Sequence, residues 1–311
     1  MKDKLIIGGG ISGLIWNFYN PEYKIITPDV GGVYGKTHMV WLHDTYETRQ
    51  FLKDLGFDQS NWTPKKSYIG YYHGGWIRNH IDSNMNKLLI QKKMSAWNEP
   101  IDKTFEPDSS KLSMGDHEST NYMNTLDVDL VKVIERLNEI CDIERGFVVD
   151  ITSNSVGVKT SFDDDKAREI PYTKLVSTIA APFFWKGYGQ EKEFGSMPIT
   201  NVITSVRPKN FDDRYEMIYY DDTVPYSRAS YLEGKYALEF SGVITEDEFK
   251  ELFPELPIEE IFVVKQGRIF KNGENIPPQD NILFLGRFAE WEHGITTEHV
   301  VQKTMRLRNK F

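Results

Sequence analysis

The segment LIIGGGISGLIW, residues 5–16, decides the fold of this chain. It opens with a short apolar run at residues 5–7, continues with the glycine-rich GGGISG at residues 8–13, and resumes an apolar pattern at residues 14–16. Apolar residues before a glycine turn are typical of a buried strand, and those after it can continue as a helix. The segment therefore predicts a strand, a tight turn and a helix in direct succession.

The glycines in this turn have the spacing of a dinucleotide fingerprint. Gly8 would make the tight turn, Gly10 would let a pyrophosphate approach the backbone, and Gly13 would let the helix pack on the strand. The N–H groups at the start of the helix, around Ile11 and Ser12, would then face the anion. We predict a dinucleotide site here, with a plain tight turn as the alternative.

Composition sets limits on the class of protein. The chain has 311 residues, of which 40% are hydrophobic and 27% charged, and its formal net charge is −9. An acidic chain of this kind is unsuited to general duplex-DNA binding, which needs a basic surface. No apolar stretch is long enough to span a bilayer, and we expect a cytoplasmic protein. The single cysteine, Cys141, excludes an internal disulfide and is expected in the core.

A second glycine-rich loop follows the first helix. Residues 23–27 (YKIIT) predict the next strand, and GGVYGKT follows at residues 31–37. Asp29 stands between them, at about the distance where an acid holds the adenosine ribose, although an Asp after a Pro is also a common turn former. Two glycine loops separated by one strand are a stronger indication of a nucleotide site than one.

These motifs resemble the FAD-binding start of the flavoprotein group that includes UDP-galactopyranose mutase, amine oxidases and protoporphyrinogen oxidase. The resemblance rests on GGGISGL, the following strand and GGVYGKT, and it implies FAD as the cofactor. It places Gly31, Gly32 and Thr37 along the pyrophosphate and ribityl chain. It also implies that the strand GFVVDI at residues 146–151, with Val148, lies beside the adenine.

The resemblance extends to two further motifs. WLHDT, followed by an amphipathic helix, is similar to the mutase segment whose histidine lies close to the flavin ring, which implies that role for His43. Its alternative is a histidine that caps the helix beside Asp44. Near the other end, NILFLGR at residues 281–287 resembles the strand and Gly-Arg that complete the cofactor site. The residues that this last motif assigns to FAD are Gly286, Arg287, Gly294 and Thr296, where Thr296 caps a final helix that runs to Leu307.

A motif in the interior of the chain resembles the substrate region of the mutases. Val-Pro-Tyr-Ser-Arg at residues 224–228 matches a pattern in which the tyrosine and the arginine lie on the substrate side of the flavin. The resemblance implies that Tyr226 and Arg228 bind a polar or anionic substrate group, which a guanidinium can hold in a bidentate manner. The alternative is a turn arginine paired with Asp222.

The substrate contacts depart from the family pattern. Where mutases carry tyrosines for the substrate diphosphate, this chain has Trp291 and His293. A tryptophan can stack on a planar group, and a histidine can move a proton near neutral pH. The substitution favours a planar or amine-bearing substrate, with the alternative that Trp291 packs in the core and His293 caps the helix.

Other segments predict ordinary elements. Three consecutive aspartates from Asp163 to Asp165 predict a solvated hairpin turn, and we expect no metal site. The polar stretch 95–125 predicts a long loop or lid. The remaining predictions are a hairpin at residues 67–77, helices at 81–94 and 126–141, a buried strand at 175–185, antiparallel strands at 201–206, 215–221 and 235–241, and a further strand pair within 261–270.

The fold expected from these features is α/β, with a discontinuous Rossmann-like FAD-binding domain and an inserted substrate domain built on an antiparallel sheet plus helices. We expect the FAD-binding domain to comprise residues 1–70, 126–182 and 261–311. The substrate domain would comprise residues 71–125 and 183–260.

The function expected is that of an FAD-dependent oxidoreductase, mutase or lyase acting on a small amine-bearing or nucleotide-linked substrate. Three alternatives stay open: a lyase or oxidase that modifies an amino-acid or sugar adduct of a nucleotide, as in phage-type base modification, a true UDP-galactopyranose mutase, and a non-catalytic FAD or NAD binder. Expected partners are the small-molecule or nucleotide-linked substrate alone, without a membrane, and a homodimer is left open.

Overall fold

The computed structural model has a mixed α/β architecture with one parallel and several antiparallel sheets. It describes residues 3–32, 42–57, 64–66, 68–72, 75–77, 92, 125–126, 128–161, 163–209, 211–213, 216–219, 222, 224–232, 234–270, 275–308 and 310–311. Thr37, residues 95–124 of the lid predicted at 95–125, and the helix predicted at 81–94 apart from Lys92 lie outside these residues.

The chain divides into two compact units, each made of separate segments. The first unit comprises Met1–Trp62, Val128–Phe194 and Asn272–Phe311. The second comprises Thr63–Asp127 and Gly195–Lys271. Each unit thus gathers residues that are distant along the chain.

A five-stranded parallel sheet forms the centre of the first unit. Its order is β18-β12-β1-β2-β8, so the first strand of the chain lies in the middle and is buried on both sides. This explains why residues 5–7 are continuously apolar, since a strand covered on both faces does not alternate. The strands are β1 (Lys4–Gly10), β2 (Lys24–Gly31), β8 (Ile143–Arg145), β12 (Lys174–Ser177) and β18 (Ile282–Phe284).

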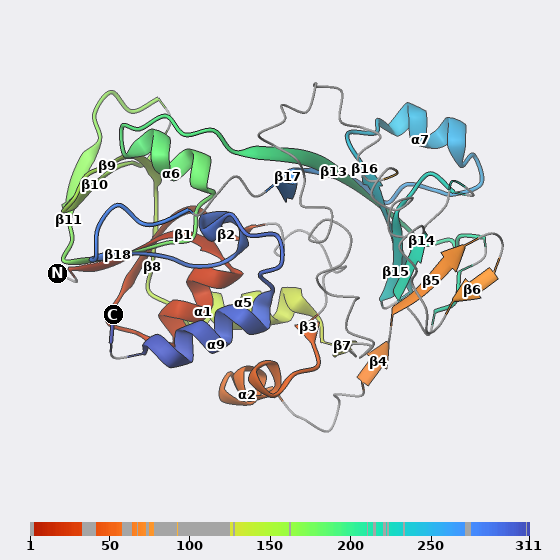
Figure 1. Ribbon diagram of the computed structural model, residues 1–311, viewed down its shortest axis with the longest axis horizontal. Coiled ribbons are helices and arrows are strands. Elements are labelled where there is room, and N and C mark those ends of the chain that lie inside the picture. Colours follow the sequence, from red (N-terminus) through yellow and green to blue (C-terminus); the bar gives the residue numbers. More distant parts are fainter. Residues whose placement is uncertain are drawn as a thin grey trace. The chain divides into compact units, whose positions relative to one another are not determined.

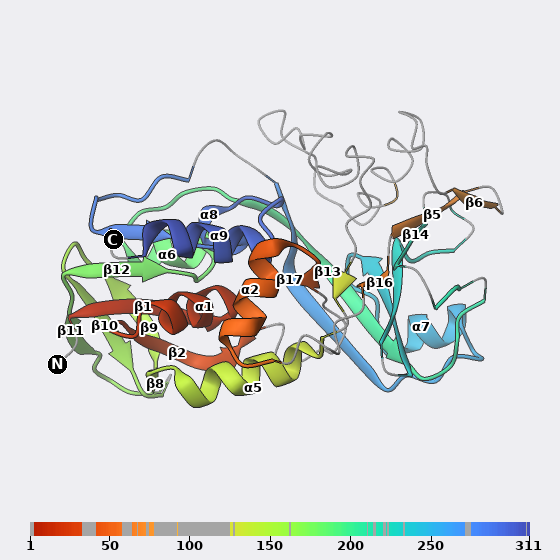
Figure 2. The same ribbon diagram turned by 90° about the horizontal axis from the view of Figure 1, so that it is seen from below.

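Helices cover one face of this sheet. Figure 1 shows α1, α5 and α9 along one face, and in Figure 2 the three helices lie side by side. The predicted helices after the first glycine turn and at the end of the chain are confirmed, and the one predicted at 126–141 begins later, where the Asp129 side chain accepts from Val131 N. The helices of this unit are α1 (Ile11–Tyr19), α2 (Tyr46–Asp54), α5 (Leu130–Ile140), α6 (Ala181–Gly187), α8 (Arg287–Glu290) and α9 (Thr297–Leu307).

The segment after β12 differs from its prediction. A buried strand was expected over residues 175–185, but the strand ends at Ser177 and α6 begins at Ala181. Pro182 stands in the first turn of α6, where its missing N–H costs nothing and its fixed φ suits a helix. The apolar run is thus shared between a strand and a helix, which periodicity alone does not separate.

An antiparallel sheet and a short strand complete the first unit. The hairpin predicted around the three aspartates is confirmed, because β10 pairs antiparallel with both β9 and β11. The Asp164 carboxylate accepts hydrogen bonds from the backbone and hydroxyl of Thr160 and from Ser161 N, which closes the turn. The strands are β3 (Leu42–His43), β9 (Phe147–Ile151), β10 (Ser155–Lys159) and β11 (Arg168–Pro171).

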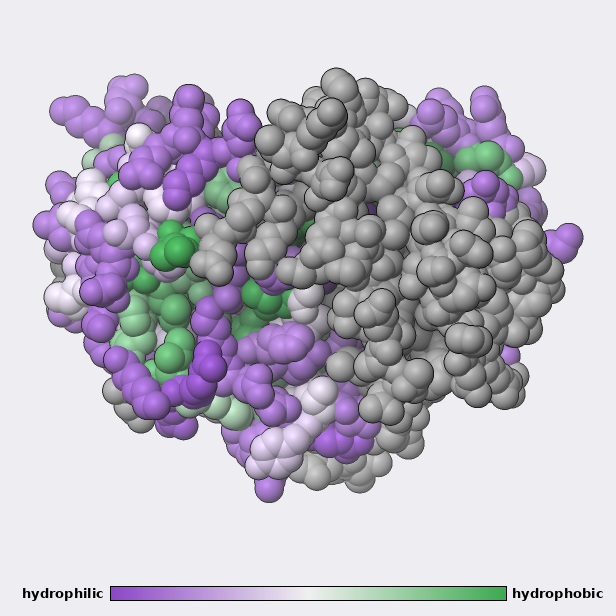
Figure 3. Space-filling model, viewed as in Figure 1, coloured by the Kyte–Doolittle hydropathy of each residue, from purple (hydrophilic) through white to green (hydrophobic). Residues whose placement is uncertain are grey.

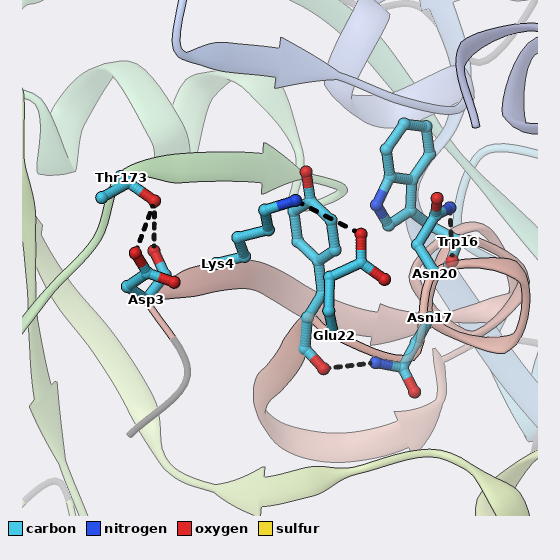
Figure 4. A network of polar contacts seen from close by, with 8 residues as sticks. Asp3, Lys4, Trp16, Asn17, Asn20, Glu22 and Thr173 are labelled. Atoms are coloured by element: carbon cyan, nitrogen blue, oxygen red, sulfur yellow. Dashed lines mark hydrogen bonds and ion pairs between the residues drawn. The ribbon is translucent and has the colours of Figure 1, made fainter. Parts of the chain in front are cut away.

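Buried asparagines fix the end of α1 to the sheet. The Asn17 amide donates to Tyr23 O at 2.8 Å, and its side-chain oxygen accepts from Asp142 N just before β8. Asn20 donates to Trp16 O at 3.0 Å, as Figure 4 shows together with the Lys4–Glu22 ion pair. These contacts satisfy the polar groups at the helix C-terminus. They also connect the C-terminal end of α1 to the residues that directly precede β2 and β8.

The second unit is built on a seven-stranded sheet of order β17-β13-β16-β15-β14-β5-β6. All neighbours are antiparallel except β14 and β5. The hairpin predicted at 67–77 is confirmed by the pairing of Tyr72 with Gly75. The elements are β4 (Pro64–Lys66), β5 (Tyr68–Tyr72), β6 (Gly75–Ile77), β7 (Thr125–Leu126), β13 (Gly195–Thr204), β14 (Glu216–Tyr219), β15 (Arg228–Leu232), β16 (Lys235–Ser241), α7 (Glu246–Leu252) and β17 (Glu260–Phe270).

Aromatic side chains form the core beside this sheet. Tyr226 packs edge-on against Tyr219 at a centroid distance of 4.8 Å and contacts Phe240 and Phe253. Phe249 of α7 is fully buried in the same cluster. On the molecular face in Figure 3, hydrophilic residues cover much of the described surface, with hydrophobic groups between them.

Candidate functional site

The glycine turn between β1 and α1 is a point of close backbone approach. A Cβ added at Gly13 would overlap the carbonyl oxygen of Gly8. Only a glycine at position 13 lets the first turn of α1 come this near to the end of β1. The predicted packing role of Gly13 therefore has a direct geometric basis.

Gly10 differs from Gly13 because it borders open space. A Cβ at Gly10 would meet nothing within 4 Å, and its φ of −69° is one that any residue adopts. Gly10 is the N-cap of α1, and no described side chain caps this end of the nine-residue helix. The first N–H groups of α1, at Ile11 and Ser12, are thus left for a ligand, and a helix N-terminus favours an anion. The open space beside these N–H groups, which a side chain at position 10 would fill, fits a pyrophosphate.

The second glycine loop lies against the first. Gly31 pairs with Gly10 in the sheet register, and a Cβ on Gly32 would lie 3.6 Å from the Gly10 Cα. Asp29 is inside the C-terminal end of β2, because that strand continues beyond the predicted residue 27 to Gly31. Its exposed carboxylate accepts from Val30 N at 2.9 Å.

The Gly-Arg motif near the other end of the chain reaches the same turn. Gly286 has φ of +92°, a conformation that glycine adopts without strain, and a Cβ on it would overlap the Ser12 hydroxyl. Arg287 follows at the start of α8 and is half-buried. The structure therefore brings the first, second and third predicted cofactor motifs together at the start of α1.

The remaining predicted cofactor residues lie on other elements of the same unit. Thr296 directly precedes α9 and donates its N–H to His299 Nδ1 at 3.2 Å. Gly294 is exposed and borders open space. Val148 is half-buried in β9, opposite Val158.

His43 forms a close pair with a residue that the sequence did not indicate. Its Nδ1 lies 2.6 Å from Oε1 of Glu298, and the two side chains are only 11% and 9% exposed. Burial would raise the pKa of Glu298, but hydrogen bonding and the charge of His43, with further hydrogen bonds from Thr296 and the backbone, lower it to about 2. Glu298 is therefore a carboxylate in the first turn of α9.

His43 does not cap α2. The N-cap is Thr45, whose hydroxyl accepts from Thr48 N at 3.2 Å, while Asp44 binds the guanidinium of Arg49. The alternative interpretation of His43 as a capping residue is therefore wrong. In the sequence, Glu298 is only an acid close to a predicted helix cap. Acids are common at that position and do not indicate a histidine partner.

Trp291 and His293 follow α8. Trp291 is 2% exposed and packs against Phe194 with a centroid distance of 5.0 Å. It has φ of +53°, the only positive φ among the described non-glycine residues. His293 is half-buried, with its Nδ1 inside the protein. Trp291 is thus held by packing in an unusual backbone conformation.

Arg228 and Tyr226 belong to the second unit. Arg228 begins β15, and its Nη2 donates to Oε2 of Glu239 on β16 at 2.6 Å. The other oxygen of Glu239 accepts from Arg268 of β17 at 2.7 Å. Arg268 and Glu239 are 6% and 9% exposed, whereas Arg228 is 38% exposed. Tyr226 lies in the aromatic core and is 1% exposed.

This Arg–Glu–Arg group has no counterpart among the sequence predictions beyond Arg228. A carboxylate shared by two guanidiniums is fixed in position at both oxygens, so it orients Arg228 in turn. Glu239 and Arg268 lie on different strands, and nothing in the local pattern of either strand indicates the pairing.

Among the described residues, no group of histidines, cysteines and acids could hold a metal ion. None of their helices combines the length and the apolar character that crossing a bilayer requires.

Comparisons with known proteins place the fold. No family model matches the chain, and no curated protein matches it. Several solved structures do. A Pyrococcus furiosus protein is 14% identical with a TM-score of 0.64, over 99% of this chain and 97% of that one. A reduced UDP-galactopyranose mutase is 13% identical with a TM-score of 0.60, over 99% and 93%. Cyclohexylamine oxidase from Brevibacterium oxydans is 11% identical with a TM-score of 0.63, over 99% and 98%.

The likeness extends over nearly the whole of each chain at low sequence identity. It shows that this chain has the fold that a UDP-galactopyranose mutase and an amine oxidase share.

Proposed function

We propose that this chain is an FAD-dependent enzyme that acts on a small amine-bearing or nucleotide-linked substrate. The observation that carries the proposal is the meeting of three distant glycine motifs at the start of α1. Open space lies beside Gly10, Gly32 is close to it, and Gly286 lies against Ser12. The fold shared with a mutase and an amine oxidase supports the same proposal.

The proposed cofactor contacts follow from this geometry. The N–H groups of Ile11 and Ser12 would bind the pyrophosphate, and Asp29 would bind the adenosine ribose. Gly286 and Arg287 would lie along the flavin side of the dinucleotide. Bound FAD would supply either hydride acceptance from a C–H bond or a reactive N5 for non-redox chemistry.

The chain's own groups would hold and orient the reactants. The contact between His43 Nδ1 and the Glu298 carboxylate would fix the orientation of the imidazole ring. Arg228 would bind an anionic substrate group, with Glu239 orienting its guanidinium. His293 would move a proton, and the buried Trp291 and Tyr226 would support these groups from the core.

An absorbance spectrum tests the cofactor. Protein purified and incubated with FAD, then freed of unbound ligand, is expected to retain the flavin bands. The same treatment with NAD is the matched control and is expected to leave no bound nucleotide. Retention of NAD without FAD would overturn the proposal.

A substrate panel tests the reaction class. With oxidised flavin under air, oxidation of a primary amine would produce hydrogen peroxide and show the oxidase chemistry. With reduced flavin and no oxygen, conversion of UDP-galactopyranose would show the mutase chemistry. Amino-acid and sugar adducts of nucleotides extend the panel to the lyase alternative. Stable FAD binding with no turnover across the panel would favour the non-catalytic alternative.

A further inference from the structure

The Gly286 turn is held by a side chain of its own helix. Glu290 Oε1 accepts from Gly286 N at 2.9 Å, and Glu290 N donates to Gly286 O at 2.9 Å. Both backbone polar groups of Gly286 are therefore bound by one residue. Because Gly286 has φ of +92°, a region that glycine leaves easily, these two contacts restrict a residue that would otherwise be mobile.

A lysine from the C-terminal helix fixes Glu290 in turn. Lys303 of α9 donates from Nζ to Oε2 of Glu290 at 2.7 Å and to the carbonyl of Phe284, the last residue of β18, at 3.0 Å. The Lys303 and Glu290 side chains are only 23% and 22% exposed, so solvent screens the pair less than a surface ion pair. Lys303 thus connects α9 to Phe284 at the end of β18 and to Glu290, which closes the turn.

The far side of α8 has its own anchor. Asn275 donates to Ala289 O at 2.6 Å and accepts from the Trp185 indole at 2.7 Å. These contacts hold the outer end of α8 without involving Lys303. Loss of the lysine would therefore release the Gly286 side of the turn selectively.

We infer that Lys303 and Glu290 are positioning residues that hold Gly286 against Ser12 and so preorganise the dinucleotide cradle. The inference rests on the proposed function. Neither side chain needs to touch the cofactor. Ordering a mobile glycine turn during binding would weaken affinity, and a charge-assisted link that orders it beforehand removes that cost.

The first test is cofactor affinity. Lys303→Met keeps most of the length of the side chain and removes its donors, and Glu290→Gln removes the charge. Each variant is expected to bind FAD roughly tenfold or more weakly than the wild type, the size of effect typical of a charge-assisted hydrogen bond. The double variant should bind about as weakly as either single one, because both act through one link. Lys303→Arg, which keeps the donors, should restore most of the affinity.

A matched control separates this effect from loss of any ion pair. Lys250→Met breaks the exposed pair with Glu246 on α7, in the other unit. It is expected to leave FAD affinity unchanged. The substituted side chains at 290 and 303 have room, because both residues border a surface pocket of about 330 Å³.

Amide hydrogen exchange in the cofactor-free protein provides the second readout. The segment 284–291 should exchange faster in Lys303→Met and Glu290→Gln than in the wild type and in Lys250→Met. Unchanged exchange together with unchanged FAD affinity would overturn the inference and leave the proposed function intact. If wild-type protein binds no FAD, the proposed function fails, and the exchange rates alone then decide whether the two residues hold the turn.

Discussion

His43 Nδ1 and Glu298 Oε1 lie 2.6 Å apart although they are 255 positions apart in the chain. The pair connects the short strand β3 to the first turn of α9, and both side chains are largely buried. Because Glu298 stays ionised, Nδ1 of His43 carries the proton, which fixes the orientation of the imidazole. The family resemblance suggested His43, and its contact with Glu298 gives a physical reason for the orientation of the ring.

Acid stability should depend on Glu298. A carboxyl whose pKa is about 2 in the folded chain, against an ordinary 4.5, contributes stability above about pH 4.5 that is lost as the pH falls toward 2. The contribution is on the order of 3 kcal/mol. In Glu298→Gln, the thermal midpoint should be lower at neutral pH and fall less between about pH 5 and pH 3.

Glu22→Gln is the control for this prediction, because Glu22 forms an exposed pair with Lys4. Its pH dependence should resemble that of the wild type. An unchanged slope in Glu298→Gln would mean that the His43 pair does not hold the carboxylate ionised.

Two glycines of the same motif should respond differently to substitution. Gly10→Val should fold with near wild-type stability, because its side chain enters open space, but should lose FAD binding. Gly13→Val should destabilise the protein itself, because its Cβ would overlap Gly8 O. Thermal melts and flavin retention measure the two effects. Unaltered FAD binding by folded Gly10→Val would contradict the predicted position of the pyrophosphate.

The members of the Arg–Glu–Arg group should contribute unequally to the stability of the protein. Glu239→Gln leaves the 6%-exposed Arg268 without its carboxylate and should cost about 3–5 kcal/mol of unfolding free energy. Arg228→Met should cost less, since Arg228 is 38% exposed and Glu239 keeps Arg268. Chemical denaturation compares them. Equal losses would show that Arg228 has a mainly structural role rather than one in substrate binding.

At Trp291, replacement by glycine should destabilise the protein less than replacement by alanine. Trp291→Ala removes a buried ring and should destabilise the protein by about 3–5 kcal/mol. Trp291→Gly removes the same ring but relieves the left-handed backbone at φ +53°, so it should be about 1 kcal/mol more stable than the alanine variant. Elsewhere glycine is normally the more harmful of the two. Denaturant midpoints that rank alanine above glycine would contradict this.

Local patterns in the sequence were sufficient for much of the fold. The glycine turn with its flanking strand and helix is confirmed because spacing over a few residues determines the backbone path. The final helix, from its cap at Thr296 to Leu307, is confirmed for the same reason. The strand predicted at 175–185 is confirmed only to Ser177, since a continuous apolar run does not say where a strand ends and a helix begins.

The sequence by itself determined the glycine motifs and the type of element around each of them, because these depend on neighbouring residues. Only the tertiary structure decided which distant groups meet: Gly286 with Ser12, His43 with Glu298, and Glu239 with Arg228 and Arg268. Those contacts depend on the register of strands and on the faces of helices that pack together. A hydrogen bond between residues far apart in the chain leaves no periodic trace in either segment, so folding in three dimensions alone specifies it.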